Sequence, residues 1–165
     1  AVGATSVVTT STVTLAANVL AGGYLSVAVT PGQGYTYRIK GNTAATAAVT
    51  TIYLEDPILV ALTTSSKIVL ALSPYASIIV NPATASGAPV GVAVYPVTAA
   101  QYGWIQTRGP VSLLNDGGTA VGLGLAPSAS VAGAAKTMAA TLCQIGYAMN
   151  VQVTTEYDLA FLTID

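Results

Sequence analysis

The sequence predicts an all-β protein, and three observations favour that fold class. Apolar and polar residues alternate with period two in short runs, which is the pattern of half-buried strands. Gly, Pro, Asn and Asp gather between the runs, where turns require them. Threonine and valine are frequent within the runs, as a pleated surface favours. We expect a β-sandwich or β-barrel with short antiparallel strands and little or no helix.

Each expected strand is an alternating run that ends at a turn residue or at a loss of period. The clearest run covers residues 34–40, where tyrosine and isoleucine alternate with threonine and basic residues. In chain order, the expected strands cover residues 6–15, 24–29, 34–40, 49–54, 58–62, 67–72, 76–80, 90–95, 102–107, 111–114, 144–149 and 157–164.

The segments between the runs predict turns, one loop and a possible domain boundary. Residues 31–34 (Pro-Gly-Gln-Gly) and 115–118 (Asn-Asp-Gly-Gly) carry residues that adopt positive φ in tight hairpins. Residues 81–89 have the composition of a longer loop. Residues 132–142 are alanine-rich like a helix, but they are short and uncapped, so a stable helix is not favoured. A soft boundary at 96–100 divides an N-terminal β lobe, 1–98, from a C-terminal barrel-like lobe, 99–165, unless the two form one continuous domain.

Composition excludes several classes of function. Of 165 residues, 53% are hydrophobic and only 7% are charged, with five Lys or Arg and a net charge of −1. So few cations argue against nucleic-acid binding. With no His and one Cys, imidazole catalysis, an internal disulfide and a structural zinc site are excluded, so we expect no cofactor and no metal. No run approaches the roughly 18 apolar residues of a membrane helix, no signal peptide is visible at the start, and we expect no membrane partner.

The candidate reactive groups have simpler structural interpretations. The adjacent acids 55–56 would point to opposite faces of a strand and indicate a strand end. Glu156 and Asp158 share a face without a calcium-loop spacing, which is typical of a solvated hairpin. Cys143 has no nearby activating group and is expected to be a small buried hydrophobe. Residues 65–67 (Ser-Ser-Lys) are typical of a turn. We therefore expect no enzymatic activity.

The low charge instead predicts a protein that is covered in an assembly. A β-rich chain with exposed strand edges and almost no charged residues should aggregate as a monomer. A module on a larger shell and a self-assembling filament or surface-layer subunit both satisfy this requirement. An eight-stranded outer-membrane barrel fits poorly, because most runs are shorter than its strands of about 9–11 residues. A carbohydrate-binding or hydrolytic β-module needs an aromatic platform or a carboxylate pair, for which the sequence offers weak candidates.

Several stretches resemble head decoration (cement) proteins of tailed bacteriophages. They are GYTYRIKGN (34–42), LEDPI (54–58), YGWIQTRGP (102–110) followed by LLNDGG (113–118), IGYAM (145–149) and EYDLAFLTID (156–165). The resemblance spans most of the chain and lies in the order of these strand-and-turn motifs, none of which is catalytic.

The resemblance implies a structural protein of the virion. Such a protein would be a small β-sandwich or β-barrel, often a homotrimer, that binds the major capsid protein on the outer capsid surface and stabilises the shell. Trp104 lies near Tyr102 and Arg108, a composition typical of interface anchors, although a core tryptophan capped by a cation is an equal alternative. Together with the cations of the resembling stretches, the candidate interface residues are Tyr35, Tyr37, Arg38, Lys40, Tyr102, Trp104 and Arg108.

Overall fold

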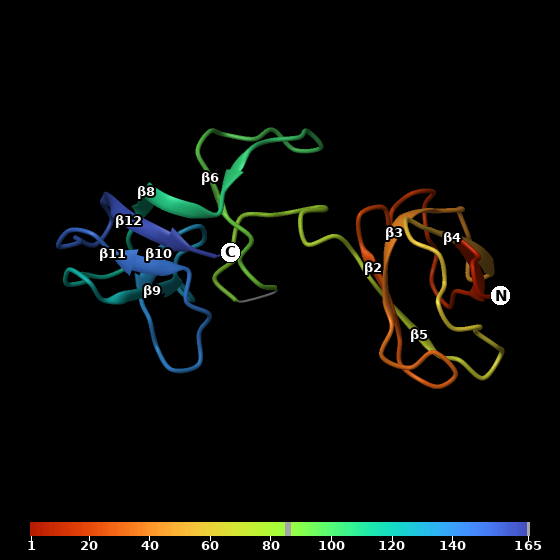
Figure 1. Ribbon diagram of the computed structural model, residues 1–165. Coiled ribbons are helices and arrows are strands. Elements are labelled where there is room, and N and C mark those ends of the chain that lie inside the picture. The colour runs from red at the N-terminus through yellow and green to blue at the C-terminus, as the bar shows by residue number, and fades with distance from the viewer. Residues whose placement is uncertain (85–86, 165) are drawn as a thin grey trace. The chain divides into compact units, whose positions relative to one another are not determined.

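The chain is built from strands and loops throughout the part that its computed structural model describes, residues 1–84 and 87–164 (Figure 1). Those residues form two five-stranded antiparallel sheets and one two-stranded sheet, none closed into a barrel and with no helix among them. The all-β prediction is therefore confirmed, with open sheets in place of the barrel alternative. Residues 85–86 of the loop expected at 81–89, and Asp165 of the last motif, lie outside the described residues.

Two compact units divide the chain, Ala1–Ala76 and Ser77–Asp165. The lobes expected at 1–98 and 99–165 divide the chain at a different place, and their limits as folding domains stay a prediction. Within residues 1–84 and 87–164, no helix is long and apolar enough to span a membrane.

The first unit is one sheet with the strand order β1-β4-β3-β2-β5. Its strands are β1 (Ser6–Thr10), β2 (Tyr24–Val27), β3 (Thr36–Asn42), β4 (Val49–Leu54) and β5 (Ile68–Ala71). The turn predicted at 31–34 joins β2 to β3, and Gly32 and Gly34 adopt φ values of 85° and 88° there. Because side chains alternate across a strand, each strand sends every second residue into the core and the others to the opposite face.

One face of this sheet is covered by loops instead of by a second sheet. The inner side chains include Leu25, Ile39 and Ile52, all fully buried. Leu20 and Ile58 reach the same cluster from loops. The expected strand at 58–62 is thus irregular in the structure, because its apolar residues pack on the sheet from a loop that forms no ladder.

The second unit contains the other five-stranded sheet, with the order β10-β9-β11-β12-β8. Its strands are β8 (Arg108–Leu114), β9 (Gly124–Pro127), β10 (Ala135–Thr137), β11 (Gly146–Ala148) and β12 (Tyr157–Thr163), and the two-stranded sheet pairs β6 (Val92–Ala93) with β7 (Ile105–Gln106). Leu113, Leu125 and Leu162 are buried in its core.

Three local expectations for this unit differ from the structure. Residues 115–118 do not form a tight hairpin between paired strands, since they connect β8 to β9 and these strands are not neighbours. The alanine-rich segment 132–142 contains the strand β10. Residues 76–80 form no strand.

Candidate functional site

One exposed surface of the first unit combines tyrosines with charged side chains. We call it the tyrosine–cation face, and it lies on the sheet face opposite the core. Tyr24 lies directly across from Arg38 in the β2–β3 register, and Arg38 Nε is 3.5 Å from Glu55 Oε1. The tyrosine–cation face consists of Tyr24, Arg38, Lys40, Tyr53 and Glu55, all exposed.

The two tyrosines expected beside these cations have different positions. Tyr37 is only 4% exposed and lies in the core, where its hydroxyl accepts a hydrogen bond of 3.1 Å from the backbone N–H of Leu59. Tyr35 is exposed and stacks on Tyr37 with ring centroids 6.4 Å apart. Of the predicted interface residues in this unit, Tyr35, Arg38 and Lys40 are accessible and Tyr37 is not.

The second unit carries an exposed aromatic loop between β6 and β7. We call residues 94–104 the aromatic arm, and Figure 1 shows it extending from β6 in green. The side chains of Tyr95, Tyr102 and Trp104 are 77%, 104% and 90% exposed, and they line a shallow hollow of about 290 Å³. Trp104 is therefore a surface residue, and the alternative of a core tryptophan is wrong.

The base of the aromatic arm is fixed to the main sheet by one amide side chain. Gln106 Nε2 donates hydrogen bonds to the backbone carbonyls of Arg108 at 2.9 Å and Pro110 at 2.8 Å. Within the arm, a Cβ on Gly103 would lie 2.3 Å from Val97 Cγ2, so the two sides of the loop meet where glycine leaves room. Arg108 itself is exposed at the start of β8.

The acidic residues near the C-terminal strand have a structural role. The carboxylate of Asp158 accepts hydrogen bonds from the backbone N–H of Val153 at 2.8 Å, from Asn150 Nδ2 at 2.9 Å and from Asn115 Nδ2 at 3.0 Å. These donors stabilise the charged form, the Val153 N–H most, and hold the pKa of Asp158 below its ordinary value. Asp158 therefore ties the β11–β12 turn to the end of β8, while Glu156 is exposed.

The remaining reactive groups do not converge on one place. Cys143 is exposed, so the expectation of a buried cysteine is wrong. In the described part of the chain, no three or more His, Cys, Asp or Glu side chains lie close enough together to hold a metal ion. The described residues instead present two exposed surfaces that a partner could contact, the tyrosine–cation face and the aromatic arm.

Sequence reasoning missed four members of these two surfaces, namely Tyr24, Tyr53, Glu55 and Tyr95. Because side chains alternate across a strand, Tyr24 lies on the opposite face from Leu25 and Val27. The same alternation in residues 49–54 places Tyr53 on the face away from the core. A further signal is that no residue from Ile68 to Thr107 is charged, so the aromatic arm presents a surface without charged side chains.

Comparisons of the chain with models of protein families, with curated proteins and with solved structures find no match.

Proposed function

We propose that the chain is a structural virion protein of a tailed bacteriophage, a decoration or cement protein that acts by contact and without catalysis. It would bind the major capsid protein on the outer surface of the head, as a homotrimer, and stabilise the shell. The order of the resembling motifs in the sequence supports this proposal, and so does a composition with 7% charged residues.

The observation that carries the proposal is the aromatic arm. An aromatic side chain contributes about 150–250 Å² when buried, so covering its three exposed rings would remove roughly 450–750 Å² from water. A standard protein interface buries about 800 Å² on each partner. Tryptophan and tyrosine are also the residues that most often dominate binding energy. The arm alone therefore supplies most of one interface, and leaving it in water would favour aggregation.

The proposal is tested with phage heads from which this chain has been removed. Wild-type protein should rebind in stoichiometric amount and raise the temperature at which the heads release DNA. The double variant Tyr102→Ala/Trp104→Ala should lose both effects, because it removes the two most exposed rings of the arm.

Tyr157→Ala is the matched control, since Tyr157 is exposed in the same unit but lies outside the arm. Heads that bind the double variant as well as they bind the control would contradict the role of the arm. Heads whose stability is unchanged by the wild-type protein would contradict the proposed function.

A second candidate is a self-assembling filament or surface-layer subunit. The edge strand β1 (Ser-Val-Val-Thr-Thr) carries no charge, and Val8 on it is exposed, so a further strand could add to this edge. This function predicts growth of the isolated protein into fibres or sheets as its concentration rises. A single discrete oligomer at all concentrations would count against it.

A further inference from the structure

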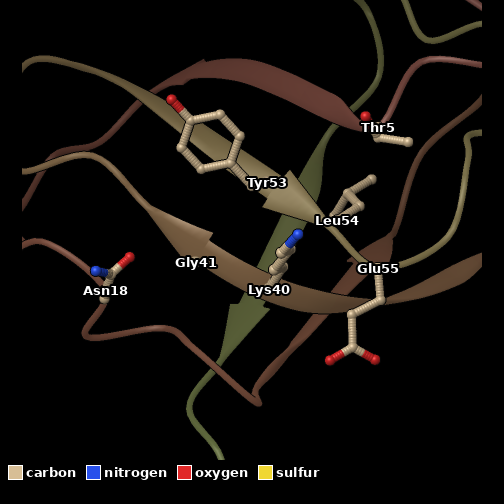
Figure 2. Close-up of a pocket in the computed structure, with 7 residues that line it drawn as sticks. All are labelled: Thr5, Asn18, Lys40, Gly41, Tyr53, Leu54 and Glu55. Carbon is tan, nitrogen blue, oxygen red and sulfur yellow. The ribbon is translucent and has the colours of Figure 1, made fainter.

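The tyrosine–cation face of the first unit contains a hollow, lined by both polar and apolar groups, that the proposed function does not use. Figure 2 shows it over β3 and β4, with Tyr53 and Lys40 on the same side of the sheet and with Asn18 and Glu55 towards opposite ends. Its volume is about 420 Å³, within the range of about 300–1,000 Å³ that small-molecule sites occupy.

Lys40 lies at a β-bulge that borders this hollow. Ile39 pairs with Leu54 and Gly41 pairs with Tyr53, so β3 has one more residue than β4 between these pairs. That extra residue is Lys40. Lys40 keeps the outward face that Arg38 also occupies, and the alternation breaks after it, where Gly41 and Asn42 are both buried. Bulges are frequent next to active sites.

The neighbouring glycine brings an amide to the same place. A Cβ on Gly41 would lie 2.6 Å from Asn18 Oδ1, so only glycine lets the side chain of Asn18 lie so close over β3. Asn18 adopts a φ of 58° in its loop, a conformation that asparagine tolerates better than most residues. Both local features hold the Asn18 amide at the rim of the hollow.

The charge of the hollow favours an anion. Glu55 is paired with Arg38 at 3.5 Å, and both side chains are about half exposed, so this pair adds no net charge to the rim although water weakens the attraction within it. Lys40 has no ion-pair partner within residues 1–84 and 87–164. The ammonium group of Lys40 is therefore the free charge at this site.

The other lining groups indicate what the anion is attached to. The ring of Tyr53 is 45% exposed and offers the electron-rich face of an aromatic side chain, against which the C–H face of a pyranose packs. Asn18 can both donate and accept hydrogen bonds, as can the hydroxyl of Thr5, and sugar hydroxyls require partners of this kind. An isolated phosphate would use Lys40 and leave the ring and the amide without a role.

We propose that this hollow binds a hexuronate unit of an acidic polysaccharide. Lys40 pairs with the sugar carboxylate, Tyr53 packs against the pyranose ring, and Asn18 and Thr5 bind hydroxyl groups. This binding is independent of the capsid-binding function and uses the opposite sheet face from the hydrophobic core of the first unit.

The test is an NMR titration of the full-length protein with trigalacturonate and, separately, with its neutral methyl ester. Trigalacturonate should shift the amide signals of Gly41 and Tyr53 in a saturable manner. The methyl ester should bind at least about tenfold more weakly than trigalacturonate, because it cannot form the charge-assisted hydrogen bond to Lys40.

Matched variants separate the site from general charge and aromatic effects. Lys40→Gln and Tyr53→Ala should each weaken binding of trigalacturonate by about tenfold, whereas Lys67→Gln and Tyr75→Ala, at exposed positions of the same unit, should bind like the wild type. Tyr53→Phe should keep the affinity, since the ring face carries the contact.

Three results would overturn the proposal: no saturable shift at Gly41 and Tyr53, equal binding of acid and ester, or equal affinities of Lys40→Gln and Lys67→Gln. Loss of capsid binding in the arm variants would not affect this measurement, so the two proposals fail independently.

Discussion

Replacing Asn42 with alanine should destabilise the first unit more than any exposed substitution. Asn42 is buried, and its Nδ2 donates to the backbone carbonyls of Ala16 and Thr43 at 2.9 Å each, while its Oδ1 accepts from Leu20 N–H at 3.0 Å. Each such bond contributes about 1 kcal/mol, and a buried donor left without a partner costs about 1–3 kcal/mol. Asn42→Ala should therefore lower the free energy of unfolding of this unit by about 3 kcal/mol.

Amide hydrogen exchange measures this loss in each unit separately. The amides of Ile39 and Leu54, which are hydrogen-bonded in the first sheet, should exchange about a hundredfold faster in the variant. The amides of Ile145 and Ala148 in the second unit provide the internal control and should keep their rates.

If the exchange rates of the Ile39 and Leu54 amides rise by an amount equivalent to less than about 1 kcal/mol, the reasoning is refuted. Such a loss is smaller than the cost of leaving one buried donor without a partner. Equal acceleration in both units would also refute it, since the three lost hydrogen bonds all lie within the first unit.

Two further substitutions and one labelling experiment test other parts of the structure. Gly146→Ala should unfold or strongly destabilise the second unit, because its Cβ would lie 2.1 Å from the backbone carbonyl oxygen of Phe161, and thermal unfolding followed by circular dichroism measures the loss. The pKa of Asp158 is lowered in the folded state, chiefly by the Val153 N–H, so its stabilising effect is present above its ordinary pKa and is lost as pH falls through the folded value. The difference in free energy of unfolding between wild type and Asp158→Asn should therefore narrow as the pH falls below the ordinary aspartate pKa; a difference that stays constant with pH would contradict this. Cys143 is exposed, so a maleimide should label the native protein as fast as the denatured one, and strong protection would contradict the structure.

The all-β class and most strands of the first unit could be predicted because one face of each strand is buried. Tyr24–Val27 alternates in sequence and in burial, and Val49–Leu54 alternates in burial. Where that condition fails, prediction fails as well. In β9, Leu125 and Ala126 are adjacent and both fully buried, which removes the period-two signal.

Small side chains explain the strand β10 that was not expected. Ala135 is buried on the sheet, and an alanine-rich segment has a composition typical of helices, so tertiary packing decides its conformation. The opposite error occurs at 58–62, where Ile58 is an apolar core residue supplied by a loop.

The candidate sites were predictable in part for a related reason. Sequence shows that Trp104 and Tyr102 lie close along the chain, but it does not show whether their rings are covered. The exposure of the arm depends on the short β6–β7 pairing, which covers only two residues of each strand. The alternation places Lys40 on the outward face of β3, but it does not show that Asn18 lies over Gly41, because that contact joins a loop to a strand distant in sequence.

The strand order of the first unit determines how it would carry mechanical load. The chain enters through β1 at one edge and leaves through β5 at the other, and because every pairing between them is antiparallel, these two strands point in the same direction. The entry and exit points therefore lie at diagonally opposite corners of the sheet, across four inter-strand spacings of about 4.8 Å each. Tension between those corners acts partly along the strands, so several inter-strand hydrogen bonds must break together. The unit should therefore resist pulling better than a sheet whose hydrogen bonds break one after another from one end.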